Sequence, residues 1–98
     1  MRFVWDPRKN QENIRNRNLD FAEARNIFQR PMLRMLDDRY DYGEDRWIAI
    51  GMLDSVRIVV VVFTERDENT IRIISMRKAL SHEQKRYEQA YRNEFGSL

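Results

Sequence analysis

Residues Val56 to Ala79, which read VRIVVVVFTERDENTIRIISMRKA, carry the most informative pattern of the chain. Its two apolar runs, Ile58 to Thr64 and Ile71 to Met76, are rich in β-branched residues and flank a polar segment, so the stretch predicts a β-hairpin. Arginines stand within the second run and just after it. A guanidinium group offers phosphate oxygens a planar fork of donors, so an apolar sheet that carries arginines is suited to holding a phosphate backbone.

The pairing of the two hairpin strands follows if the turn is Arg66 to Asn69. Glu65 then lies opposite Thr70 and Phe63 lies opposite Arg72, which places Glu65 and Arg72 on one face of the sheet. Both faces are largely apolar, so we expect a central hairpin that is covered on both sides. A slip of one residue would exchange the two faces, because side chains alternate along a strand.

Length and composition place the chain among globular proteins. It has 98 residues, of which 42% are hydrophobic and 35% charged, and this predicts a single domain over residues 1–98. It contains no cysteine, which excludes disulfides and thiolate metal sites, and no apolar run reaches membrane-spanning length. The N-terminal residues do not form a signal-peptide pattern, so a cytoplasmic location is the simplest expectation.

The kind of positively charged residue is more informative about function than the net charge. The net charge is +2, which alone does not imply a nucleic-acid partner. Fifteen arginines stand against three lysines, and arginine is the better residue for phosphate recognition. An arginine-rich genome would give the same bias, and the sequence leaves both explanations open.

The remaining pattern predicts an α+β fold with a mostly antiparallel sheet, in the order strand, helix, helix, four strands, helix. The pair Asp6-Pro7 is typical of a helix start, and Asn18 tolerates the left-handed geometry of a helix end. The acidic segment Asp37 to Asp45 reads as a solvated loop. The expected elements are a strand at Arg2 to Trp5, helices up to Arg17 and at Phe21 to Phe28, strands at Met32 to Leu36 and Trp47 to Leu53, the two hairpin strands, and a helix that begins in the capping box Ser81-His82-Glu83-Gln84 and stops at Gly96.

Blocks spread along almost the whole chain form a recognisable pattern. They are Phe3-Val4-Trp5-Asp6, Lys9, Asn13, Phe21, Arg46 to Gly51, Val61 to Arg66, Ile71 to Ala79, Glu83 and Tyr87. In this order they resemble the BrnT family of bacterial toxin–antitoxin ribonucleases, which implies a RelE-like fold. One departure is a Lys-His-Gly triplet, common in the family, where this chain has Asn16-Arg17-Asn18. Arginine in place of histidine removes a side chain that titrates near neutral pH.

The resemblance implies an endoribonuclease toxin that cleaves RNA without a metal and so blocks translation. The 2′-hydroxyl of the RNA is then the nucleophile, and the protein must accept its proton, stabilise the phosphorane charge and protonate the leaving 5′ oxygen. We expect Arg72 and Arg77 to stabilise the phosphate, Glu65 to act as the general base, and Lys9 to be a second candidate base. The further RNA contacts are expected from Arg66, Lys78, Arg17 and Asn13. No metal and no cofactor is expected.

Each of these residues also has a purely structural interpretation, which the sequence leaves open. A carboxylate on a hairpin can simply pair with a cross-strand arginine, charges at a strand end can be solvated, and a polar helix stripe can face water. These interpretations apply, respectively, to Glu65, to Arg77 and Lys78, and to Lys9, Asn13 and Arg17.

The resemblance also implies partners. A toxin of this family is held inactive by a cognate DNA-binding antitoxin of the BrnA type, so we expect a hetero-oligomer with that antitoxin and RNA as the substrate. Operator DNA would be contacted only through the antitoxin, and no membrane is involved. The alternative is a catalytically weak member that acts mainly as an antitoxin-binding corepressor. An RNA-binding module without catalysis fits less well, because the net charge is low.

Overall fold

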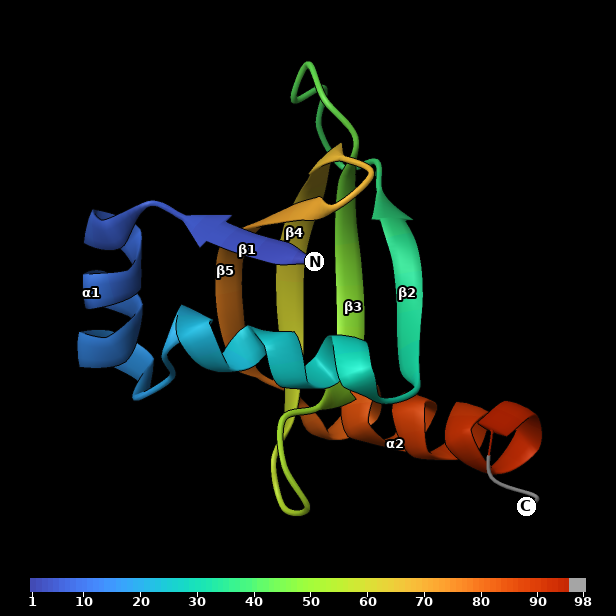
Figure 1. Ribbon diagram of the computed structural model, residues 1–98. Helices are drawn as coiled ribbons and strands as arrows, with labels where there is room; N and C mark the ends of the chain where they lie inside the picture. Colours follow the sequence, from blue (N-terminus) through green and yellow to red (C-terminus); the bar gives the residue numbers. More distant parts are fainter. Residues whose placement is uncertain (96–98) are drawn as a thin grey trace.

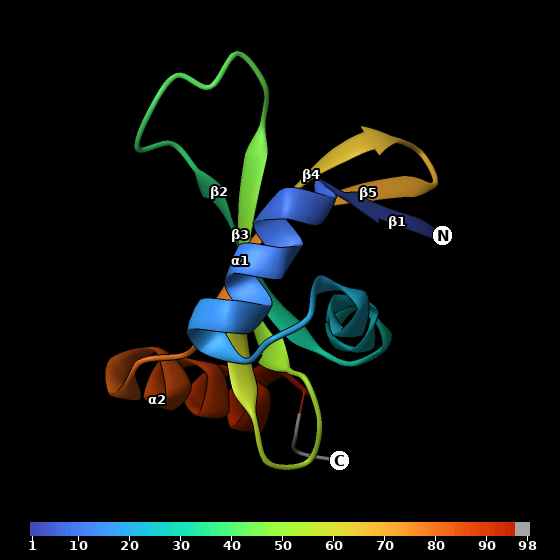
Figure 2. The same cartoon turned by 90° about the vertical axis from the view of Figure 1, so that its left-hand side faces the viewer.

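The computed structural model describes residues 1–95 and is built around one five-stranded sheet with the strand order β1-β5-β4-β3-β2. Helix η1 covers one face of the sheet, helix α2 covers part of the other, and helix α1 lies at the β5 edge (Figures 1 and 2). The strands are β1 (Arg2–Trp5), β2 (Met32–Asp37), β3 (Arg46–Met52), β4 (Ile58–Asp67) and β5 (Thr70–Lys78). The helices are α1 (Pro7–Arg17), the 3₁₀ helix η1 (Phe21–Gln29), α2 (Ser81–Ala90) and a π-helical turn η2 (Tyr91–Phe95).

The sheet is mixed, which corrects the expectation of a mostly antiparallel one. Strands β2 to β5 pair antiparallel, but β1 pairs parallel to β5, with Phe3 opposite Ile71 and Trp5 opposite Ile73. Parallel pairing requires a long connection between the two strands. The chain provides one, because β1 and β5 lie far apart in the sequence, with both N-terminal helices and three strands between them. None of the described helices has the length and apolar character needed to span a membrane.

Local signals in the sequence determine both ends of α1. Asp6 accepts a hydrogen bond from the backbone N–H of Arg8 at 2.9 Å, and Pro7 occupies the first turn. Asn18 ends the helix with a φ of 56°, and its N–H donates to the carbonyl oxygen of Ile14. A short polar side chain tolerates this left-handed backbone better than a bulky one. The helix is therefore fixed at both ends beside β5.

Two apolar layers sandwich the sheet. On the face that η1 covers, Phe21, Ala24 and Ile27 pack against Val61 and Phe63. On the α2 face, Tyr87 packs with Ile50 and Val60. These layers account for the apolar character of both faces of β4 and leave the end of the α2 face near the β2–β3 loop without a covering helix (Figure 2).

The hairpin register differs from the prediction, because β4 and β5 contain two irregularities. The turn is the pair Glu68–Asn69 rather than four residues, and Arg66 is the extra residue of a bulge. Glu65 therefore lies opposite Ile71, and Thr64 lies opposite Arg72. A second irregularity leaves Ile74 as the extra residue in β5, between the pairs formed by Ser75 and Ile73. A bulge adds one residue to one strand and bends it, so a strict alternation assigns the wrong faces beyond it.

The last helix begins one residue earlier than the predicted capping box implies. Leu80 is the N-cap, and its backbone N–H donates to Glu83 Oε1 at 2.8 Å. The predicted stop at Gly96 lies outside the described residues.

Candidate active site

The open end of the α2 face carries a small polar cavity of about 100 Å³. Three positive side chains from different elements line it: Lys9 from α1, Arg46 from the start of β3, and Arg72 from β5. The rest of the lining comprises Asp6, Glu44, Ile73 and Ile74. Such a volume is well below the roughly 300–1,000 Å³ that drug-sized ligands occupy, so the cavity is suited to a phosphate group rather than to a whole nucleotide.

The sheet register brings the two arginines of the cavity to the same face. Arg72 lies opposite Thr64, and the Thr64 hydroxyl donates to the carbonyl oxygen of Asp45 at 2.9 Å, which fixes the chain just before Arg46. Arg46 Nε donates to Glu44 Oε2 at 3.3 Å, so one of the cations is already paired with a carboxylate. Two further cations, Lys9 and Arg72, remain at the cavity for a second anionic group.

A second hollow of about 340 Å³ shares Lys9 and Ile74 with the cavity and continues along the boundary between α1 and β5. Arg17 lies there, and its Nη1 donates to Asn13 Oδ1 and to the carbonyl oxygen of Met76, both at 3.3 Å. Asn13 is buried and donates through Nδ2 to the carbonyl oxygen of Leu19 at 2.9 Å. Asn13 therefore holds the helix end and positions Arg17.

Arg77 lies on the same face of the sheet but is tied to α2. Its Nη1 and Nη2 donate to the two carboxylate oxygens of Glu83 at 2.7 and 2.8 Å. This pairing raises the pKa of Arg77 and lowers the pKa of Glu83 from 4.5 to about 2. Arg77 does not line the cavity, and the neighbouring Lys78 is exposed at the end of β5.

Glu65 lies away from the cavity, which corrects its predicted position beside Arg72. Its carboxylate forms an ion pair with Arg34 on the η1 face of the sheet. The guanidinium carbon of Arg34 also lies 4.1 Å from the centre of the Trp47 ring, a cation–π contact. Arg66 is exposed in the nearby bulge. The geometry that would make Glu65 a general base for a phosphate at Arg72 is therefore absent.

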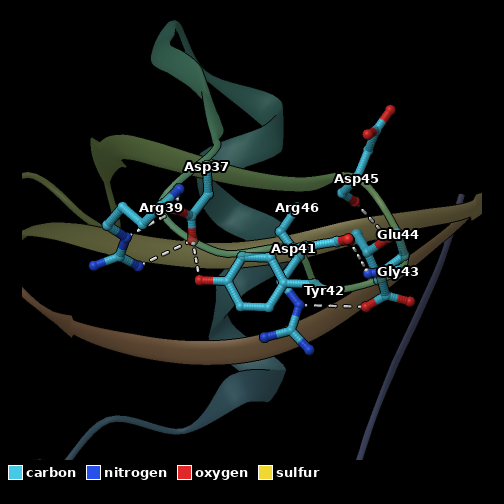
Figure 3. Close-up of polar contacts among 9 residues, drawn as sticks. Asp37, Arg39, Asp41, Tyr42, Gly43, Glu44, Asp45 and Arg46 are labelled. Carbon is cyan, nitrogen blue, oxygen red and sulfur yellow. Dashed lines mark hydrogen bonds and ion pairs between the residues drawn. The ribbon is translucent and has the colours of Figure 1, made fainter.

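The β2–β3 loop is anchored next to the cavity by a buried carboxylate (Figure 3). Asp37 accepts hydrogen bonds from Arg39 Nε and Nη2 at 2.8 and 2.9 Å and from the Tyr42 hydroxyl at 3.1 Å. The Arg39 guanidinium holds the pKa of Asp37 well below its usual range, whereas burial raises the pKa of Tyr42. The guanidinium carbon of Arg46 lies 4.1 Å from the centre of the Tyr42 ring.

Comparison with known proteins now decides the family. The family model described as "Ribonuclease toxin, BrnT, of type II toxin-antitoxin system" matches residues 5–83. The chain belongs to the BrnT family. Its structure is similar to the crystal structure of the ribonuclease toxin BrnT of Brucella abortus, with a TM-score of 0.62 and 29% sequence identity over 82% of this chain and 97% of that one. No curated protein matches the chain.

As a BrnT protein, the chain is a toxin of a type II toxin–antitoxin system and its family activity is that of a ribonuclease. Of the predicted catalytic residues, the structure brings together Lys9 and Arg72, and it separates both from Glu65 and Arg77. Sequence reasoning missed Arg46 as a site residue. Two features of the sequence could have indicated Arg46. It is the first residue of a family block, and it directly precedes the predicted strand at Trp47, where a charged side chain can face the neighbouring loop.

The BrnT cavity offers no metal centre among the side chains that the structure describes, since these contain no group of three or more His, Cys, Asp or Glu side chains arranged to hold an ion. Asp6 and Glu44 are the carboxylates at the cavity. Asp6 already caps α1, and Glu44 pairs with Arg46. The donor set is therefore mainly cationic, which suits an anionic group.

Proposed function

We propose that this BrnT toxin is an endoribonuclease that cleaves RNA through the 2′-hydroxyl without a metal ion. The observation that supports the proposal is the convergence of Lys9, Arg46 and Arg72 on one cavity of phosphate size. In-line attack by the 2′ oxygen puts additional negative charge on the phosphorane oxygens. A guanidinium group that is held in place before the reaction, as Arg46 is by Glu44 and the Tyr42 ring, stabilises this charge more effectively than solvent, because it needs little reorganisation. Arg72 contributes a second guanidinium at the same cavity.

Proton transfer is assigned to the remaining polar groups of the cavity. The Lys9 ammonium carries transferable protons, and we place it as the donor to the leaving 5′ oxygen. Of the two carboxylates, Asp6 is bound to the N-terminus of α1, whereas Glu44 pairs with Arg46 through Oε2 at 3.3 Å, so we assign Glu44 Oε1 as the acceptor of the 2′-hydroxyl proton. Glu44 replaces Glu65 in this role, because Glu65 is on the opposite face.

The hollow between α1 and β5 extends the proposed RNA path. It adjoins the cavity through Lys9 and Ile74, and it presents Arg17 to a neighbouring phosphate. Arg66 and Lys78, exposed near the ends of β4 and β5, are proposed as peripheral contacts. Arg77 is proposed to act mainly by holding α2, because its two terminal nitrogens already bind Glu83.

The wider biology of the toxin follows from the family. We propose a RelE-like single domain over residues 1–98 that acts in the cytoplasm, cleaves RNA, inhibits translation, and is neutralised in a complex with a BrnA-type antitoxin that binds operator DNA. The second candidate is a weak enzyme that serves mainly as a corepressor. Arg17 favours it, because a guanidinium held by Asn13 and the Met76 carbonyl cannot supply the proton exchange of a histidine.

The test is cleavage of single-stranded RNA by the purified protein in EDTA, comparing wild type with Arg72→Ala and Arg46→Ala. Loss of one charge-stabilising donor should lower the cleavage rate by about 10²–10³-fold, and the products should end in 2′,3′-cyclic phosphate. Arg15→Ala is the matched control, because Arg15 is exposed on α1 and does not line the cavity.

Full activity in folded Arg72→Ala and Arg46→Ala variants would refute the site. Cutting that stops in EDTA would refute the metal-independent mechanism. A wild type that binds its antitoxin but cleaves no faster than Arg72→Ala would support the corepressor instead.

A further inference from the structure

The β2–β3 loop, residues 38–45, carries two tyrosines whose placement the catalytic proposal does not explain. Tyr40 is 71% exposed, although the other aromatic rings of the fold are mostly buried or half-buried. Its ring nevertheless packs edge-on against Tyr42, with the ring centres 5.8 Å apart and an interplanar angle of 75°. An aromatic ring presented to solvent on an ordered support has a surface available for stacking.

Tyr42, on which Tyr40 packs, is bound to the sheet and not only to other residues of the loop. The Tyr42 hydroxyl donates to Asp37, which is 5% exposed and lies at the end of β2 (Figure 3). Arg39 binds the same carboxylate, and Asp45 at the other end of the loop accepts from Thr64. Both ends of the loop are therefore bound to strands that also position the cavity.

The tyrosine pair borders the proposed phosphate site through Arg46. This arginine stacks on the Tyr42 ring at 4.1 Å and lines the cavity with Lys9 and Arg72. A phosphate held in the cavity therefore lies next to the loop. In single-stranded RNA each phosphate is linked to bases on either side, so an adjoining base comes within reach of the loop.

The charge of the loop favours a base over a second phosphate. Residues 38–45 contain four carboxylates and one arginine. Phosphate would be repelled here, whereas stacking on an aromatic ring requires no charge on the base. The loop and the cavity are thus complementary to two different parts of a nucleotide.

We propose that Tyr40 is a base-stacking residue, which binds an unpaired base of single-stranded RNA next to the phosphate in the Lys9–Arg46–Arg72 cavity. This inference rests on the proposed function, since it takes RNA as the ligand of the cavity. It adds that the toxin recognises bases by stacking, which favours unpaired RNA and tolerates different sequences.

The experiment measures the Kd of the purified toxin for two single-stranded oligomers of equal length. One is 2′-O-methyl RNA, which lacks the nucleophile, and the other has the same backbone without bases. The readout is the ratio of the two Kd values. In Tyr40→Ala this preference for bases should fall by about 5- to 150-fold, which corresponds to about 1–3 kcal/mol for one stacked base. Tyr40→Phe should retain the preference, because stacking does not need the hydroxyl.

Two controls separate this inference from the proposed function. Arg72→Ala should weaken binding of both oligomers alike and leave their ratio unchanged, since it acts on the phosphate. Tyr91→Ala changes an aromatic residue beside Met52 and Val56, at the other end of β3, and should also leave the ratio unchanged. If wild-type toxin cleaves no RNA, the catalytic proposal fails. The ratio of the two Kd values still measures whether Tyr40 stacks on a base.

An unchanged ratio in Tyr40→Ala would overturn the inference, as would an equal loss of affinity for both oligomers. A Tyr40→Ala variant that binds RNA normally but loses affinity for the antitoxin would also overturn it, and would identify the loop as a protein interface.

Discussion

The ion pair between Arg77 and Glu83 predicts how the attachment of α2 depends on pH. Glu83 accepts three hydrogen bonds, two from Arg77 at 2.7 and 2.8 Å and one from the Leu80 N–H at 2.8 Å. The bonds join the end of β5 to the first turn of α2 and satisfy the N-terminus of that helix. Replacing the carboxylate by an amide in Glu83→Gln removes the charge and keeps the shape.

The magnitude follows from burial and geometry. The Glu83 side chain is 16% exposed and the Arg77 side chain 39%, so the pair is only partly screened by solvent. Exposed pairs contribute about 0.2–1 kcal/mol, and hydrogen bonds to charged groups about 1.5–3 kcal/mol. We expect Glu83→Gln to lower the free energy of unfolding at pH 7 by about 1–3 kcal/mol. Each kcal/mol corresponds to a decrease in Tm of about 4–8 °C in a domain of this size.

The pH dependence has a definite sign. The pairing lowers the pKa of Glu83 from 4.5 to about 2 in the folded protein. The carboxylate therefore stabilises the fold fully above pH 4.5, and this contribution is lost as the pH falls from 4.5 towards 2. This contribution is the difference in the free energy of unfolding between wild type and Glu83→Gln, measured by urea unfolding at pH 7, 4 and 2.5. Other carboxylates titrate in both proteins and cancel in the difference.

The matched control is Glu88→Gln, because Glu88 is an exposed residue of the same helix. It should change the free energy of unfolding by no more than about 0.5 kcal/mol. A Glu83→Gln effect that is equal at pH 7 and pH 2.5, or no larger than that of the control, would refute the argument that the ionised carboxylate holds α2.

Two further predictions concern the hairpin and the core. Glu65→Gln should leave the cleavage rate in EDTA within a few-fold of wild type, because its partner Arg34 lies on the face opposite the cavity; a loss of 10²-fold or more, as expected for Arg72→Ala, would restore Glu65 as a catalytic group. Gly51→Ala should destabilise the fold by about 1–3 kcal/mol in urea unfolding, because the added Cβ would lie 3.0 Å from Ile27 Cβ; wild-type stability would show that η1 can move away from β3.

What the sequence predicted well was local. The start of α1 at Asp6-Pro7 and its end at Asn18 depend on side chains within a few residues of the backbone groups that they satisfy. The two apolar strands of the hairpin were equally visible, because β-branched runs of this length between polar segments have few other structures available. Neither signal depends on the rest of the fold.

What the sequence could not predict depends on the bulges. Alternation along β4 and β5 placed Glu65 beside Arg72, whereas the extra residues Arg66 and Ile74 shift the pairing. A bulge is set by turn geometry and by the packing on both faces, and neither is encoded in the period of two. The parallel pairing of β1 with β5 was also missed, because it joins segments that are far apart in the sequence and no local pattern indicates which strands become neighbours.

The residues of the cavity were only partly predicted, and the periodicity of the sequence could not have identified them. Lys9, Arg46 and Arg72 come from a helix, a strand start and the middle of an edge-proximal strand, so no spacing in the sequence relates them. The family blocks contained all three, but the blocks also contain residues such as Asn13, whose buried amide holds the chain together. Burial and hydrogen bonding separate the two kinds of residue: Asn13 bonds inward to Leu19, whereas Lys9 is exposed at the cavity. A residue that a family pattern selects therefore becomes a candidate for chemistry only when the fold leaves its polar atoms facing a space that a substrate can enter.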